Sequence, residues 1–302
     1  MGHIFIFISV FFNALKSFAS KKVSTKFKEL QDVVNLNIIR NLLCFLIGII
    51  TVLISRNSLS FNFSPTEFLI LLISGVSMGF FVISWIFAIR SGAYMLVSAC
   101  SSASFIIPCL ISFLVLNENI TLPKIVSFFI ILLALFFLLR YNTQIKGKPT
   151  MKQIIFLLLV WFSQGINQSM QKLYINFSFG KAIESYTMYV FLFTTLTLLI
   201  FKFCVSFSNR TDEKNIEKKK NRKSFIKNSM IYIILMAVGL FCSSYFQTLA
   251  AKTVDAIILY PMTCALSLVA GSAMASIFFK EKFTKDSVLG IIFVFIALIV
   301  SK

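Results

Sequence analysis

Ten long apolar stretches occupy almost the whole of this 302-residue chain. Most are close to the ~20 apolar residues that a helix needs to cross the hydrocarbon of a bilayer. Hydrophobic residues make up 58% of the chain and charged residues 13%, too few charges to cover the exterior of a soluble globule. Continuous apolar runs, such as residues 128–133, lack the alternation of membrane-barrel strands. The sequence therefore predicts an all-α polytopic membrane protein.

Polar or basic segments separate most of the predicted transmembrane helices. The helices cover residues 3–19, 34–55, 66–89, 93–116, 122–140, 153–174, 184–206, 229–250, 254–279 and 286–301. The longest polar segment, residues 208–228, is too short to bury a core, so no soluble domain is expected. The first stretch lacks the basic flank and the small-residue cleavage site of a signal peptide, so we interpret it as a retained helix.

A short motif occurs twice, each time before the last helix of one half. Residues 116–121 read Leu-Asn-Glu-Asn-Ile-Thr, and residues 279–284 read Phe-Lys-Glu-Lys-Phe-Thr. A five-helix unit crosses the bilayer an odd number of times, so its second copy enters upside down. We therefore predict two inverted five-helix repeats, residues 1–146 and 147–302, an architecture typical of transporters.

These repeats, each with a turn of Glu, any residue, an apolar residue and Thr, resemble the drug/metabolite transporter superfamily, EamA type. Lys22 near the end of the first helix and Arg40 in the second match positions where such proteins often carry basic residues. A Trp-Gly pair that is common in the first helix is Phe12-Asn13 here. The resemblance implies alternating access around a central cavity lined by both halves, usually for export.

Polar side chains inside hydrocarbon are costly, so those in the predicted helices are candidates for substrate binding. The predicted sixth helix holds the richest set, spaced three and four residues apart along one face. The candidates are Asn13, Lys16, Arg40, Ser84, Trp85, Trp161, Gln164, Asn167, Gln168, Gln171, Tyr245 and Tyr260. For each of them the alternative is a hydrogen bond between helices in a dry bundle.

Two cations in the first two helices bear on the charge of the substrate. Arg40 lies about two turns into the second helix, too deep for its side chain to reach the membrane surface easily. The alternative for Lys16 is to extend its stem to the interface. No Asp or Glu lies at the centre of a predicted helix, which argues against exchange of a cation for protons on a buried carboxylate. A neutral, zwitterionic or anionic metabolite, for example an amino acid, is favoured.

Four residues are predicted to shape or gate the pathway. Pro108 and Pro261 each remove a backbone hydrogen bond and permit a kink in the fourth and ninth helices. Glu118 and Glu281 precede the last helix of each half, where a carboxylate caps free amide groups and favours the helix dipole.

Other classes of function lack the residues they need. One His and six Cys without metal or redox spacing provide no metal site or catalytic dyad, and no phosphate-binding glycine loop is present. We expect no enzyme and no cofactor, but an intramembrane lipid-modifying enzyme or a lipid-carrier flippase stays open as the alternative. The expected partners are a small-molecule substrate and the lipid bilayer, not nucleic acid, for a monomer or a homodimer.

Basic residues outside the membrane are distributed unequally. Loops after odd-numbered helices hold 21 Lys and Arg, against six elsewhere. The positive-inside rule then places these loops in the cytoplasm and both termini outside the cell membrane. The family resemblance implies both termini inside, and the sequence leaves the two orientations open.

Overall fold

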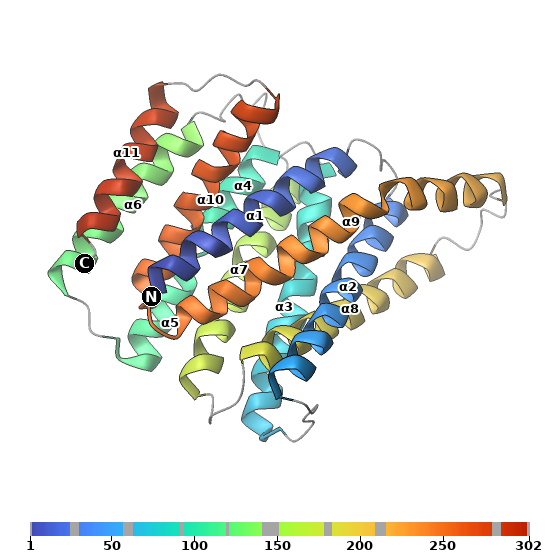
Figure 1. Cartoon of the computed structure of the whole chain (residues 1–302), viewed down its shortest axis with the longest axis horizontal. Coiled ribbons are helices and arrows are strands. Elements are labelled where there is room, and N and C mark those ends of the chain that lie inside the picture. Colours follow the sequence, from blue (N-terminus) through green and yellow to red (C-terminus); the bar gives the residue numbers. More distant parts are fainter. Residues whose placement is uncertain are drawn as a thin grey trace.

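The computed structural model describes residues 2–24, 30–56, 63–90, 94–118, 121–140, 151–177, 183–208, 216–279 and 285–300. All regular secondary structure among these residues is α-helix (Figure 1). The helices are α1 (Gly2–Ser24), α2 (Leu30–Arg56), α3 (Pro65–Arg90), α4 (Tyr94–Ala103), α5 (Ile106–Leu116), α6 (Leu122–Arg140), α7 (Met151–Phe177), α8 (Ile183–Ser208), α9 (Ile216–Ala251), α10 (Ala256–Phe279) and α11 (Lys285–Val300). The ten-helix prediction is confirmed, with α4 and α5 together forming the fourth helix.

The fourth helix is divided because of Pro108. Proline has no N–H to donate to the carbonyl of Ser104, four residues earlier, and its ring crowds that carbonyl. The Ser104 carbonyl accepts the Ile107 N–H at 3.2 Å instead, and residues 104–105 form a turn between the two helices. Pro261 lies in the second turn of α10, and the helix continues through it.

The two halves of the chain pack against each other reciprocally. The first helix of the first half, α1, lies against the third helix of the second half, α9; conversely, α3 lies against α7. Like elements also pair, α2 with α8 and α6 with α11. An exchange of roles of this kind is the pattern of a two-fold relation, and a translation does not produce it. Ser9 bonds to Ser243 and Lys16 lies against Gly239, so α1 and α9 run in opposite directions. The first and third helices of one half run in the same direction, so the second half is inverted relative to the first. Both termini lie at the same end of the bundle (Figure 1).

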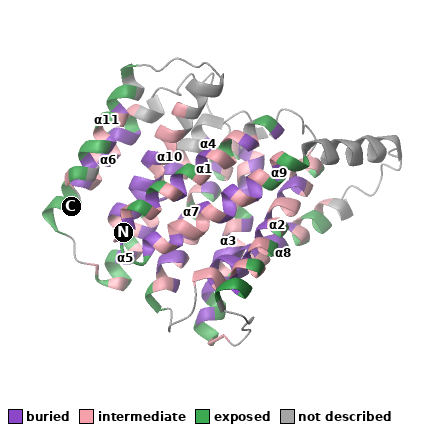
Figure 2. Ribbon diagram, viewed as in Figure 1, coloured by how far each residue is buried: buried purple, intermediate pink, exposed green. Residues whose placement is uncertain are grey.

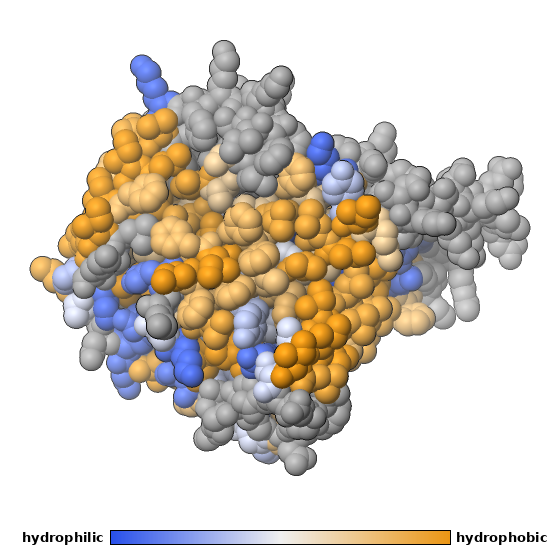
Figure 3. Space-filling model, in the orientation of Figure 1, coloured by the Kyte–Doolittle hydropathy of each residue, from blue (hydrophilic) through white to orange (hydrophobic). Residues whose placement is uncertain are grey.

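Lipid-facing side chains cover the outside of the bundle. Exposed positions hold large apolar residues, among them Phe11, Ile54 and Phe203, while buried residues line the inner sides of the helices (Figure 2). One face of the molecule is largely apolar (Figure 3). Five described segments are long and apolar enough to span a membrane: Gly2–Ser20, Leu30–Ser55, Pro65–Ala88, Ile183–Val205 and Met230–Ala251.

Glycines bring helices of opposite halves into close contact. A Cβ on Gly75 of α3 would lie 2.3 Å from the Phe193 Cβ of α8, and one on Gly79 would lie 2.6 Å from the Thr197 Cγ2. The Thr194 hydroxyl donates to the Gly75 carbonyl at 3.1 Å across the same contact. Small residues allow such tight packing in lipid, where it drives the association of helices.

Candidate functional site

The predicted polar face of the sixth helix lies on α7, and part of it contacts the opposite half of the protein. The Ser74 hydroxyl of α3 donates to the Asn167 Oδ1 at 2.9 Å. The same Ser74 hydroxyl lies 2.7 Å from the Tyr186 hydroxyl of α8. Asn167 therefore takes part in a hydrogen-bonded chain that links three helices between the halves.

One turn further along α7, polar groups connect this helix to α9 and α10. The Tyr260 hydroxyl donates to the Gln168 carbonyl at 2.7 Å and lies 3.4 Å from the Gln171 Oε1. The Gln171 Nε2 donates to the Thr248 Oγ1 at 2.7 Å. Gln168, Gln171 and Tyr260 are all buried. These contacts are hydrogen bonds between helices, the alternative that the sequence left open for this face.

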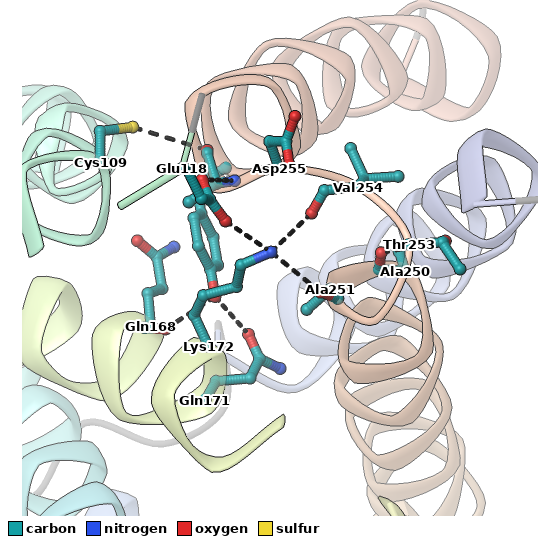
Figure 4. A network of polar contacts seen from close by, with 12 residues as sticks. Cys109, Glu118, Gln168, Gln171, Lys172, Ala250, Ala251, Thr253, Val254 and Asp255 are labelled. Carbon is teal, nitrogen blue, oxygen red and sulfur yellow. Dashed lines mark hydrogen bonds and ion pairs between the residues drawn. The ribbon is translucent and has the colours of Figure 1, made fainter. Parts of the chain in front are cut away.

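Lys172 ends this polar face, and sequence reasoning did not include it among the site residues. Its ammonium nitrogen lies 2.9 Å from the Glu118 Oε1 (Figure 4). It also donates to the carbonyls of Ala251 at 3.0 Å and Val254 at 2.8 Å, near the C-terminal end of α9. The ammonium, with three N–H groups, thus has three acceptors.

Glu118 caps a different helix from the one expected. The sequence placed its carboxylate at the start of the helix that follows it, but the Glu118 Oε2 accepts the Ala256 N–H at 2.9 Å, at the start of α10 in the other half. The reason is local: Asn117 ends α5 in the left-handed conformation, with φ of 49°, and redirects the chain. A second ion pair, Lys124 with Asp255 at 2.5 Å, joins the same two segments. Glu281, the equivalent of Glu118, lies outside the described residues.

Lys16 and Arg40 differ from the rest of the predicted set. Each is half-buried, and neither has a hydrogen-bond or ion-pair partner in the part of the chain that the structure describes. The Arg40 Nε is enclosed and unpaired. The two cations repel each other electrostatically, with the Cys44 thiol near both.

The other candidates are distributed over several helix contacts. The Asn13 Nδ2 donates to the Ser267 Oγ at 3.0 Å, and the Tyr245 hydroxyl donates to the Glu184 Oε1 at 2.9 Å. Ser84 is buried within α3, and the Trp85 ring lies 5.4 Å from that of Phe81. In the described part of the chain, no hydrogen bond links these four residues to one another.

Trp161 and Gln164 lie on α7 on the α4–α5 side. The Trp161 Nε1 donates to the Ala103 carbonyl at 3.1 Å. The Gln164 Oε1 is enclosed and has no partner among the residues that the structure describes. A depression of about 330 Å³ lies beside Trp161. Its other lining residues are the exposed apolar side chains Ile155, Leu158, Leu159 and Phe162, so it faces lipid. Among the described residues, no three His, Cys, Asp or Glu side chains lie close enough together to hold a metal ion.

Two inverted halves with polar side chains between them define a polytopic membrane protein of the inverted-repeat class. The sequence profile of the EamA-like transporter family matches residues 1–140 and 151–301, and the chain belongs to that family. The protein is thus a membrane transporter of the drug/metabolite type, which implies a small-molecule substrate and a lipid environment. The predicted boundary between residues 146 and 147 falls in the gap between the two matches and outside the described residues.

The fold also matches a solved structure. That structure, titled "Crystal structure of protein", is similar to this chain with a TM-score of 0.78 and 10% identity, over 100% of this chain and 95% of that chain. At that identity the likeness supports the fold alone. No curated protein matches the chain.

Proposed function

We propose that the protein exports a small polar, zwitterionic or anionic metabolite across the cytoplasmic membrane by alternating access. The observation that supports a polar substrate is the set of buried polar atoms without partners, which includes the Arg40 Nε, the Asn41 Oδ1 and the Gln164 Oε1. Nearly all buried polar groups in proteins are hydrogen-bonded, so an exception calls for an explanation. A polar solute that binds and leaves supplies one.

We rank the candidate residues as substrate contacts by whether their buried polar atoms lack a hydrogen-bond partner. Arg40 and Gln164 come first, because each has a buried atom without a partner, and Lys16 joins them as an unpaired cation. Asn13 and Asn167 follow, since each has a side-chain hydrogen bond to the opposite half, with Ser267 and Ser74, that a bound solute replaces. Gln168, Gln171 and Tyr260 hold α7, α9 and α10 together and are assigned to positioning.

Alternating access requires contacts that form on one side and break when that side opens. The Glu118–Lys172 pair joins the two halves at the end of the bundle where both termini lie (Figures 1 and 4). Opening this end separates the carboxylate from both Lys172 and the α10 amide, and water then solvates the released charges. The helix break at Pro108 lies one helix away from Glu118 on the chain and allows α5 to move relative to α4.

Transport by the purified full chain in proteoliposomes tests this function. We expect efflux of one or more solutes from a panel of amino acids and organic acids, and slower efflux by Asn167→Ala and Gln164→Ala. Leu158→Ala, on the lipid-exposed side of α7, is the matched control and should behave like the wild type. A protein that moves labelled phospholipid but no solute contradicts the proposal and supports the flippase alternative. Normal solute efflux by both variants contradicts the assignment of the site.

A further inference from the structure

Arg40 lies on the side of α2 that faces away from lipid. Leu36, Asn37 and Cys44, three or four residues from Arg40 and on the same face of the helix, are buried, whereas Leu42 is exposed. Successive residues of a helix are about 100° apart, so Arg40 lies about 160° around the axis from Leu42. Ten residues of helix precede Arg40, about 15 Å of axial length, which keeps the guanidinium away from that end of the membrane span. Arg40 therefore points into the protein.

Lys16 approaches the same region from α1, which packs against α9 as α2 does. A Cβ on Gly239 of α9 would lie 3.1 Å from both the backbone nitrogen and the Cβ of Lys16. On the α2 side, the Cys44 thiol donates to the Ala237 carbonyl of α9 at 3.3 Å. Since Cys44 is one turn from Arg40, the two cations flank the same part of α9, and they interact electrostatically with each other.

Among the described residues, no carboxylate forms an ion pair with Lys16 or Arg40. Glu118 is paired with Lys172, Asp255 with Lys124, and Glu184 accepts from Tyr245. Lys16 lies close enough to Arg40 for electrostatic repulsion, and the Cys44 thiol is near both. Two neighbouring cations withdrawn from water are costly unless an anion neutralises them.

We propose that Lys16 and Arg40 form a recognition site for the anionic group, carboxylate or phosphate, of a transported solute. This inference rests on the proposed transport function and narrows its substrate class. The planar guanidinium presents donors in a fixed fork that fits a carboxylate or phosphate, and the lysine on α1 adds a compact charge. A neutral solute leaves the repulsion between the two cations in place, and a cationic one adds to it.

Binding to the purified full chain in nanodiscs of phosphatidylcholine tests the site directly. The probes are inorganic phosphate and succinate, with succinamide as the neutral analogue of succinate, and the readout is ligand-dependent thermal stabilisation. We expect stabilisation by at least one anion and none by succinamide. Arg40→Gln and Lys16→Gln should each weaken anion binding by about tenfold or more, as expected for loss of a charge-assisted hydrogen bond. Lys202→Gln removes an exposed charge on α8 and should bind like the wild type.

The outcomes separate this site from the proposed function. Equal stabilisation by succinate and succinamide, no response to either anion, or unchanged anion binding in both variants overturns the inference. Stabilisation that appears only when phosphatidylglycerol is added, and that depends on Arg40, assigns the site to a lipid headgroup and also overturns it. Anion binding without transport of any solute leaves the site in place and contradicts the transport function. Transport of neutral solutes without anion binding supports the transport function and overturns the anion site.

Discussion

Lys172 and Arg40 are long cations enclosed in the same bundle, and their surroundings are opposites. The Lys172 ammonium has a carboxylate and two carbonyls within hydrogen-bond distance. The Arg40 Nε has no partner, and its charged neighbour in the described residues is another cation, Lys16. The comparison teaches that polarity inside a membrane has two uses: a satisfied group holds helices together, and an unsatisfied group has bonding capacity left for a ligand.

The largest effect on stability should follow from breaking the ion pair between Glu118 and Lys172. Glu118→Gln leaves the Lys172 charge buried without its counter-ion and should lower the free energy of unfolding by about 3 kcal/mol. The midpoint of unfolding in a mild detergent measures this. The double variant Glu118→Gln, Lys172→Met should recover part of the loss, because no uncompensated charge remains. A loss below about 0.5 kcal/mol in the single variant would show that the pair does not stabilise the fold.

Arg40→Met should raise the free energy of unfolding, whereas Glu118→Gln lowers it. This variant gives the sharpest test of the contrast between Arg40 and Lys172. Replacing a half-buried cation that has no counter-ion by an apolar side chain of similar length removes its desolvation cost, so we expect stabilisation by about 1 kcal/mol. The same unfolding measurement, without ligand, detects the change. A destabilised Arg40→Met protein would mean that the guanidinium already has structural partners, and the distinction between the two cations would fail.

Most of the fold could be predicted from the sequence because its signals are local and repeated. Apolar length gives the ten helices, and the repeat of residues 116–121 at 279–284 gives two halves that odd crossing numbers invert. The break between α4 and α5 was predicted only as a possible kink at Pro108. Whether a proline bends or divides a helix depends on whether the freed carbonyl finds another donor, which for Ser104 is the Ile107 N–H.

The site was harder to predict because its partners are distant in the chain. Spacing alone located the polar face of α7. It did not reveal that Lys172, near a predicted helix end, meets Glu118, 54 residues earlier, because that contact needs the left-handed turn at Asn117 and the packing of the two halves. Lys172 lies 150 residues after Lys22, and both are near the end of the first helix of their half. This correspondence between the repeats was a signal that could have drawn attention to Lys172.

Tyr260→Phe tests an uncharged member of the hydrogen bonds that join α7 to α10. The variant removes the hydroxyl that donates to the Gln168 carbonyl, while the aromatic ring keeps its packing in the core. The expected loss is about 1 kcal/mol, the net value of a buried hydrogen bond. Thermal unfolding measures it, and Tyr232→Phe, in a partly buried position on α9, is the matched control. A loss as large as that of Glu118→Gln would mean that charge does not distinguish the pair from the rest of the network.

The smallest effect should come from Lys124→Gln, although the Lys124–Asp255 contact, at 2.5 Å, is shorter than the Glu118–Lys172 contact, at 2.9 Å. The exposed fractions of the side chains are 19% and 39% in the first pair, against 9% and 14% in the second. Water screens the more exposed pair and solvates Asp255 when its partner is removed, so the loss should stay below about 1 kcal/mol. Unfolding at low and high salt measures it, since screening should reduce the contribution of this pair further. If Lys124→Gln costs as much as Glu118→Gln, distance rather than burial sets the strength of ion pairs at this end of the bundle, and the contrast between satisfied and unsatisfied interior charges loses its physical basis.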